Sequence, residues 1–337
     1  MTLRVPRRAY VFVGLSLALA LFWPVFFGLG EYTGSLLIGV VLESYSRLRG
    51  AKLGVPCPEL VFIVCARVGG YLFAFLPSSK IASVDELLLK FDGNFGYVEA
   101  LAGKLFRMNQ VIEQILEISY WVIPLAGVLV YLGLRNEAMI RRRYIVTNGL
   151  VTLIFCFYRL CPAAGPRPLI GTAFPNAIPD LANPHAQIIP GITLNAMPSG
   201  HFTWALLLFW FARRYGGRGL RIGASVYLFL IGLATLGKGE HYVIDLIVAV
   251  PFAAGVWALG EGRWKRAGAT LLVVFLWCMA LGQGWALILP RLVAWLLSAM
   301  TVIPFVPGPE ANLFGRLHYR PRILPEAEPA GETGSTM

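Results

Sequence analysis

The sequence NAMPSGHFTWALLLFWFARRYGGRGLRIGASVYLFLIGLATLGKGEHYVID, residues 195–245, decides the fold expected for this chain. It holds two apolar runs, separated by a short basic loop at Arg213–Arg221. This pattern predicts a helical hairpin that crosses a membrane and returns. His201 stands at one end of the hairpin and His241 at the other, so the hairpin brings both to one membrane face. Two imidazoles in a mostly apolar chain indicate acid–base or nucleophilic chemistry.

The composition of the whole chain is also typical of a membrane protein. Hydrophobic residues make up 57% of the 337 residues and charged residues 14%, whereas a soluble domain carries about 25% charged residues. The net charge of +11 does not indicate a nucleic-acid partner, because the basic residues cluster in short loops between apolar runs, where the positive-inside rule puts them. The lipid bilayer is the expected surrounding. The five cysteines form no CxxC pair, so we expect neither a disulfide framework nor a zinc site.

The apolar runs predict an all-α fold, a polytopic helical bundle in the membrane. The chain divides into an N-terminal membrane anchor and interfacial region (1–109), a catalytic transmembrane domain (110–306) and a disordered tail (307–337). The spans expected are 10–28, 111–134, 144–160, 201–211, 222–236, 241–259, 267–286 and 287–306. The first is interpreted as an uncleaved signal anchor, with cleavage near Gly30 as the alternative. Residues 35–76 fit two short crossings or a re-entrant pair.

Two segments outside these spans bear on the site. Within 77–109, apolar residues recur at helical spacing, which fits an amphipathic helix on the membrane surface or an ordinary solvated helix; these apolar residues are Val84, Leu87, Leu88 and Leu89. Residues 161–200 hold eight prolines, which exclude a continuous helix. A loop of this length is usually functional. All strongly basic loops fall on one side of the predicted topology and this loop on the other. We therefore expect a bacterial inner-membrane protein whose site faces the periplasm.

The first candidate catalytic pair is His241 and Asp245. They are four residues apart, so on one helix their side chains share a face. A carboxylate there accepts a hydrogen bond from one imidazole nitrogen and makes the other a better nucleophile or base. The alternative is a pair that only satisfies a buried carboxylate.

A second candidate feature is the start of the helix at His201. Ser199 is a natural N-cap, and the free N–H groups around Gly200 would bind an anion. His201, in the first turn, could protonate a leaving oxygen. The alternative is a capped membrane helix with an interfacial histidine.

Three basic residues are candidate phosphate ligands on the same membrane face. Arg167 follows the end of the 144–160 span, and its guanidinium suits bidentate phosphate binding. Arg159 lies near the outer end of that span, and Lys238 lies three residues before His241. Each also fits an interfacial anchor or a turn residue.

In this order and spacing, the motifs resemble those of the type-2 phosphatidic acid phosphatase superfamily, which carries K-x6-R-P, then P-S-G-H, then S-R-x5-H-x3-D. Arg167-Pro168 matches the end of the first motif, Pro198–His201 the second, and His241 with Asp245 the end of the third. The resemblance covers about residues 144–260. Leu160 stands where the first motif has lysine, and Ala234-Thr235 where the third has Ser-Arg. The stretches PAAGPR, NAMPSGH and HYVID look more like the branch that contains inositol phosphorylceramide synthase, and that branch also tolerates losses in the outer motifs.

The resemblance implies a six-helix phosphatase-like core and a lipid phosphatase or phosphotransferase that needs no metal or other cofactor. The substrate would be a prenyl, glycero- or sphingolipid phosphate, and the acceptor water or an alcohol such as inositol. It implies that His241 attacks phosphorus to form a phosphohistidine, that Asp245 orients it, and that His201 protonates the leaving group. The phosphoryl oxygens would be held by Arg167, Lys238, Arg159 and the amides near Ser199 and Gly200.

Two rival functions stay open at this point. One is a membrane metallohydrolase that uses the same histidines and Asp245, with His185 as a further ligand. The other is a non-enzymatic transporter or scaffold of the same general build.

Overall fold

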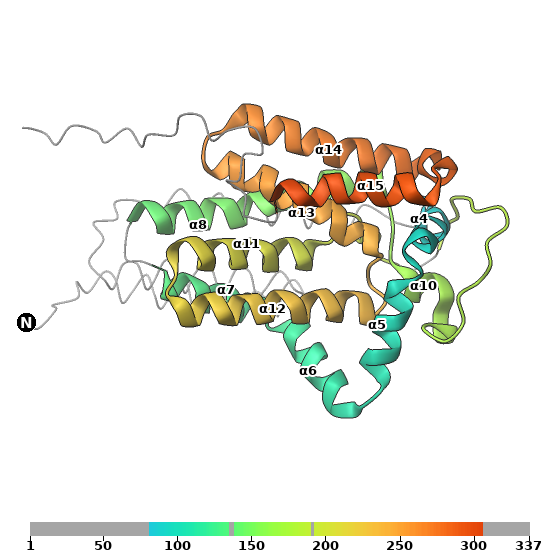
Figure 1. Cartoon of the computed structure of the whole chain (residues 1–337), viewed down its shortest axis with the longest axis horizontal. Coiled ribbons are helices and arrows are strands. Elements are labelled where there is room, and N and C mark those ends of the chain that lie inside the picture. The colour runs from blue at the N-terminus through green and yellow to red at the C-terminus, as the bar shows by residue number, and fades with distance from the viewer. Residues whose placement is uncertain (1–80, 135–137, 190–191, 306–337) are drawn as a thin grey trace, which may run out of the picture.

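A computed structural model of the chain describes residues 81–134, 138–189 and 192–305. These residues form helices and connecting loops, and two isolated bridges are the β-structure within them. Figure 1 shows the long helices lying side by side as a bundle. The all-α prediction is therefore confirmed for the described part of the chain. The expected N-terminal anchor, the segment 35–76 and the expected disordered tail lie outside the described residues.

The predicted hairpin is present. Helix α11 (Gly200–Tyr215) begins where the Ser199 hydroxyl accepts a hydrogen bond from the N–H of Phe202 at 3.4 Å, as an N-cap does. The chain turns at two glycines and returns as α12 (Arg218–Gly237) to the end of the bundle where α11 began. Helix α13 (Val243–Gly260) then starts from that same end.

Helix α13 lies at the centre of the bundle. Its described side chains are mostly buried, and α14 (Trp264–Gly282) packs along it. Gly255 permits this approach, because a Cβ there would lie 2.8 Å from a Leu271 methyl group. On another side, Phe211 of α11 packs on the ring of Trp257 with ring centroids 4.4 Å apart. Small residues at helix contacts and stacked aromatic rings are the means by which membrane helices associate without a hydrophobic driving force.

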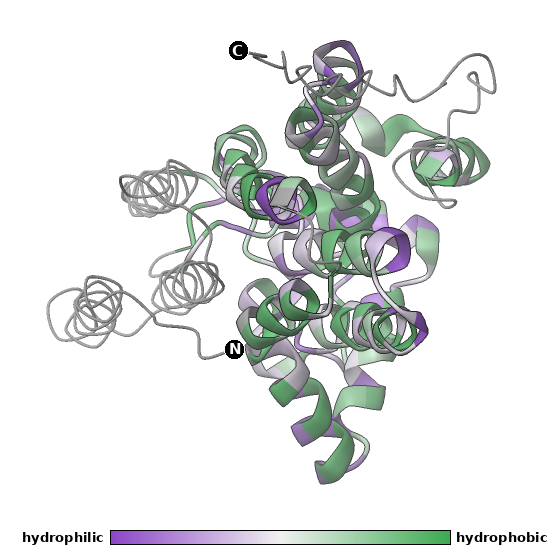
Figure 2. Cartoon of the chain, turned by 90° about the vertical axis from the view of Figure 1, so that its left-hand side faces the viewer, coloured by the Kyte–Doolittle hydropathy of each residue, from purple (hydrophilic) through white to green (hydrophobic). Residues whose placement is uncertain are grey.

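The outer surface of the bundle is apolar. Among the described helices, α12, α13 and α14 are long and apolar enough to cross a membrane. Large side chains such as Ile222, Phe229 and Leu276 point outward and are more than half exposed. Figure 2 shows hydrophobic residues along the outer faces of the helices as well as inside the bundle. Such a surface is stable in lipid and would aggregate in water.

The span expected at 111–134 is not one continuous helix. The chain forms two helices, α6 (Gln110–Trp121) and α7 (Ile123–Gly133), which are bent by 66° at the break between them. Pro124 explains the break, because proline lacks the N–H that would continue α6 and its ring clashes with the preceding turn. As a result α6 runs at an angle to the long helices of the bundle. It forms a V with α5 (Val98–Arg107) on one side of the bundle (Figure 1).

The remaining helices follow the predicted order. The path from 138 to 160 is helical, with a short 3-10 turn between α8 and α9, and the proline-rich loop holds one five-residue helix, α10. The bounds are α8 Ala138–Leu150, α9 Ile154–Leu160, α10 Pro166–Ile170 and α15 Arg291–Val302.

The amphipathic segment within 77–109 packs against other helices of the protein. This differs from both expectations, a helix on the membrane surface and an ordinary solvated helix. It forms α4 (Asp85–Asp92) and α5 (Val98–Arg107). The apolar residues Val84, Leu87, Leu88 and Leu89 are at most 8% exposed. They face the core of the bundle because α4 packs on α10, α13 and α14, while α5 lies along α12. The expected domain boundary at residue 109 stays a prediction.

The two ends of the bundle differ in chemistry. At one end Glu261 pairs with Arg143 at 3.0 Å, Arg263 at 3.1 Å and Arg214 at 3.6 Å. The predicted grouping of the basic loops at one end is therefore confirmed. The opposite end carries α4, α5, α10 and the proline-rich loop, together with the start of α11 (Figure 1).

Candidate active site

The site begins where the backbone after Cys161 meets the turn before His241. The N–H of Arg167 donates to the carbonyl oxygen of Gly239 at 2.9 Å. A Cβ at Gly165 would lie 2.5 Å from the carbonyl group of Glu240. Gly239 has φ +72°, and a Cβ there would lie 2.7 Å from the Cβ of Arg167. Glycine at both positions therefore lets the two loops touch and places Arg167 beside the turn that leads to His241.

The segment before α11 joins these two loops. The N–H of Ala196 donates to the carbonyl of Ala163 at 2.8 Å, and the N–H of Ser199 donates to the backbone carbonyl of Asp245 at 3.2 Å. Both Ala196 and Ser199 are buried. The three motifs identified in the sequence thus meet through backbone hydrogen bonds.

His241 is held through its Nδ1 atom. This nitrogen lies 2.9 Å from the carbonyl oxygen of Ala196 and 3.4 Å from Oδ2 of Asp245. A carbonyl oxygen accepts a hydrogen bond and donates none, so in the neutral ring Nδ1 carries the hydrogen and Nε2 keeps its lone pair. The side chain is 4% exposed. The geometry suits Nε2 for nucleophilic attack.

The expectation that His241 and Asp245 lie on one helix is wrong, because α13 begins at Val243. His241 lies in the extended backbone before the helix. The two side chains still meet, because Asp245 turns back to cap the first turn of α13. Its Oδ2 atom accepts the N–H of Tyr242 at 2.8 Å.

His201 and Lys238 share an aromatic neighbour on α6. The rings of His201 and Tyr120 are stacked, with centroids 3.9 Å apart and an angle of 24° between their planes. The Nζ atom of Lys238 lies 4.4 Å from the centroid of the Tyr120 ring, a cation–π contact. Tyr120 therefore orients two of the predicted site residues. Its role could not be predicted from the sequence, where it is one aromatic residue of an apolar run.

The ammonium group of Lys238 is paired with an acidic residue of α6. Its Nζ atom lies 2.9 Å from Oε1 of Glu117, and the indole N–H of Trp121 donates to the same oxygen at 2.7 Å. Lys238 is 8% exposed. A phosphate group would bind the same ammonium, so the Glu117 carboxylate occupies the position at which that phosphate would bind. An acidic residue inside an expected membrane span was the available signal.

A buried carboxylate of α4 ties the Arg167 loop to α13. Asp85 accepts the N–H of Ala164 at 3.0 Å, the N–H of Gly165 at 2.8 Å and the hydroxyl of Tyr242 at 3.0 Å. Burial raises the pKa of Asp85, and these hydrogen bonds act in the opposite direction. Asp85 was not among the residues identified from the sequence, because its partners lie 79 to 157 residues away.

Two further buried acids support the start of α13. Asp92 accepts the N–H of Val243 at 2.5 Å and the N–H of Ile244 at 3.2 Å. Burial and the nearby Glu99 raise the pKa of Asp92 well above its usual range, and burial raises the pKa of Glu99 to about 7. Two buried carboxyl groups this close do not both carry a charge at neutral pH. Of these acids, Asp92 and Asp85 hold the start of the helix that carries Asp245 through hydrogen bonds.

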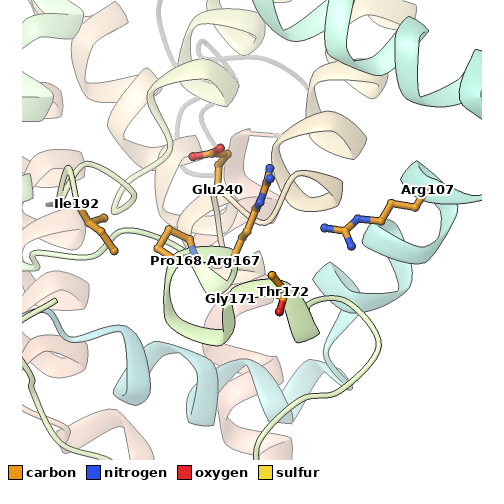
Figure 3. A pocket seen from close by; sticks show the side chains of 7 residues that line it. All are labelled: Arg107, Arg167, Pro168, Gly171, Thr172, Ile192 and Glu240. Carbon is orange, nitrogen blue, oxygen red and sulfur yellow. The ribbon is translucent and has the colours of Figure 1, made fainter. Parts of the chain in front are cut away.

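An open pocket of about 590 Å³ lies beside these residues (Figure 3). The residues that line it come from α5, α10 and the two loops, and they are Arg107, Arg167, Pro168, Gly171, Thr172, Ile192 and Glu240. Arg167 is thus on the wall of the pocket, whereas His201, His241 and Asp245 are not. Arg159 is half-buried in the last turn of α9 and does not line the pocket either.

The metal ligands expected of a metallohydrolase are not assembled in the described part of the chain. The His185 ring nitrogen Nδ1 lies 3.2 Å from a carboxylate oxygen of Glu86, on an exposed loop. Among the described residues, His, Cys, Asp and Glu side chains form no group of three or more that could hold a metal ion.

Comparison with protein families gives the same assignment as the motifs. A family model described as the PAP2 superfamily matches residues 86–259, slightly more than half of the chain. The chain belongs to the PAP2 superfamily. The match runs from α4 to α13 and includes Arg167, His201, His241 and Asp245. Comparison with curated proteins and with solved structures gives no match. Family membership and the apolar helices together identify an integral membrane protein of the phosphatase type.

Proposed function

We propose that this PAP2 protein is a membrane lipid phosphatase or phosphotransferase that works through a phosphohistidine at His241. The observation that carries the proposal is the position of His241. Its Nδ1 is held by Ala196 and Asp245, which leaves Nε2 free, and the Arg167 loop is bonded to the turn before it. A fixed tautomer beside an arginine is suited to attack on a phosphate ester.

The first step forms a bond between Nε2 of His241 and phosphorus, and it breaks the bond from phosphorus to the lipid oxygen. His201 donates a proton to that oxygen. Arg167 and Lys238 hold the phosphoryl oxygens together with the amides near Ser199 and Gly200, and Arg159 stays a candidate for the same role. In the second step the hydroxyl of water or an alcohol attacks phosphorus, the bond from phosphorus to Nε2 of His241 breaks, and His201 takes the acceptor's proton, which restores both histidines.

The acceptor decides the type of reaction. Water releases inorganic phosphate, whereas an alcohol such as inositol gives the phosphate monoester of that alcohol. The stretches PAAGPR, NAMPSGH and HYVID favour the branch that contains inositol phosphorylceramide synthase. The substrate proposed is a prenyl, glycero- or sphingolipid phosphate.

The test uses the purified full-length protein with lipids labelled in the phosphate group. We expect the label to leave as inorganic phosphate or to move to an added alcohol, and we expect EDTA to have no effect. If neither product forms, the proposal is wrong. If EDTA stops the reaction and a divalent ion restores it, the metallohydrolase is the better account.

Replacing Glu117 with glutamine is expected to lower KM about three- to tenfold with little change in kcat. The reason is that the phosphate must displace Glu117 from Lys238, and an uncharged amide is displaced more easily. Glu113→Gln is the matched control, because Glu113 is exposed on the same helix, one turn earlier. A KM that rises in Glu117→Gln alone would mean that Glu117 holds Lys238 in place for the substrate rather than competing with it.

We propose further that the protein lies in the bacterial inner membrane with this site facing the periplasm, because the basic loops that the structure describes gather at the opposite end. A cysteine introduced at Asn183, in the exposed proline-rich loop, should react with an impermeant reagent added outside the inner membrane. A cysteine at Lys265, in a basic loop, should not. The reverse pattern would invert the proposed orientation.

A further inference from the structure

The pocket beside the site holds two arginines, and the charge of one of them, Arg167, also acts on Glu117 of α6. Arg107 stands at the end of α5 and Arg167 at the start of α10, and their guanidinium groups reach into the pocket from different sides (Figure 3). Neither guanidinium makes a hydrogen bond or an ion pair with a described residue. Both side chains are exposed. Two like charges that share a pocket repel each other, and an anion between them removes that repulsion.

The other lining residues define what kind of anion fits. Glu240 adds one negative charge, so two cations and one carboxylate line the pocket. Thr172 supplies a hydroxyl group, and Pro168 and Ile192 contribute apolar surface. A volume of about 590 Å³ lies within the usual range of small-molecule sites. Guanidinium groups bind phosphate oxygens in pairs, so a phosphate-type group is the anion that fits best.

The two arginines differ in their distance along the chain from the reacting centre. Arg167 is bonded through its backbone to Gly239, two residues before His241, and so belongs with the phosphoryl group that His241 attacks. Arg107 comes from another element, α5, which packs on α6, on α12 and, at Gly103, on Phe174 and Pro175 of the proline-rich loop. It is therefore placed to meet a different group, one that is next to the reacting phosphate.

We propose that this pocket is a second anion subsite, in which Arg107 binds a phosphate group adjacent to the phosphoryl group at His241. The proposal rests on the function proposed above. The second phosphate belongs either to the lipid substrate, which is then a diphosphate, or to a water-soluble acceptor alcohol that already carries a phosphate. The pocket lies at the end of the bundle that carries α5, α10 and the proline-rich loop. A lipid diphosphate and a water-soluble phosphorylated alcohol can both reach it there.

The experiment compares the full-length protein with Arg107→Gln, Arg107→Lys and Lys104→Gln. Lys104 is an exposed cation on α5, one turn earlier, and it does not line the pocket. The first ratio measured is kcat/KM for a lipid diphosphate over that for the monophosphate of the same lipid. The second is label transfer from a lipid phosphate to glycerol 3-phosphate over transfer to glycerol.

Arg107→Gln should lower one of these ratios about 10- to 100-fold, the effect of one charge-assisted contact. The ratio that falls identifies the source of the second phosphate. Arg107→Lys should recover part of the loss, and Lys104→Gln should change neither ratio. Two unchanged ratios in Arg107→Gln would overturn the proposal.

A binding measurement separates this proposal from the proposed function. The wild-type protein should bind inorganic pyrophosphate at least about tenfold more tightly than inorganic phosphate, and Arg107→Gln should lose the difference. If no lipid phosphate is turned over but this difference is seen, the subsite stands and the proposed function fails. If lipid phosphates are turned over and Arg107→Gln alters neither the ratios nor pyrophosphate binding, the subsite fails and the function stands.

Discussion

Replacing His241 with alanine is expected to lower kcat by at least about 10⁴-fold, because it removes the atom that attacks phosphorus. Loss of a nucleophile in other covalent enzymes costs about this much or more. The measurement is the release of phosphate by the purified protein under saturating lipid phosphate. The loss should be the same for all phosphate substrates, since each depends on the same nitrogen.

The control for this variant is His185→Ala, a histidine in an exposed loop that pairs with Glu86. It should retain near-normal activity. Insertion into the membrane and the thermal melt of His241→Ala should be close to those of the wild type, because alanine leaves the bond from Tyr242 to Asp245 in place. Normal turnover by a folded His241→Ala protein would rule out the nucleophile assignment.

Replacing His201 with alanine is expected to lower kcat about 10²- to 10⁴-fold for a lipid phosphate, the usual contribution of a general acid. An alkoxide is a poor leaving group and needs the proton that His201 supplies. For an aryl phosphate such as p-nitrophenyl phosphate, the leaving group needs no proton, so the loss should be about tenfold or less. The comparison of both substrates with both proteins measures the role of His201 separately from its contact with Tyr120.

The same comparison for Tyr120→Phe is a control, because phenylalanine keeps the stacked ring. That variant should behave like the wild type with both substrates. An equal loss on lipid and aryl phosphates in His201→Ala would show that His201 positions the substrate and does not protonate the leaving oxygen.

The helical hairpin and the grouping of the three motifs could be predicted because the signals are local. Apolar runs of spanning length and basic turns fix the direction of each helix, and a residue such as Ser199 marks a helix start without reference to the rest of the chain. Once the directions are known, His201 and His241 must lie at the same end of the bundle. Arg167 follows, because the helix before it runs to that end.

The support around the site could not be predicted, because it comes from contacts across long sequence separations. Asp85 and Asp92 resemble ordinary polar residues of an amphipathic helix, yet they bind the backbone at Ala164, Gly165, Val243 and Ile244. Periodicity shows that α4 has an apolar face but does not show whether lipid, water or protein covers it.

The position of α6 over the site was also missed, although Pro124 was visible in the sequence. A proline in an apolar run can kink a membrane helix or break it, and neighbouring helices decide which. The 66° bend brings Glu117 and Tyr120 to Lys238 and His201. The roles of Glu117 and Tyr120 depend on that bend, and the spacing of residues in the sequence does not predict its angle.

The most direct test of the central claim is to trap the phosphorylated enzyme. Wild-type protein is mixed with lipid labelled in the reacting phosphate and quenched within milliseconds to seconds. We predict label on the protein that is stable in base and labile in acid, as a phosphohistidine is, located on the peptide that holds His241 and absent from His241→Ala. Turnover by the wild type with no trapped label on that peptide, or equal label in His241→Ala, would contradict the account.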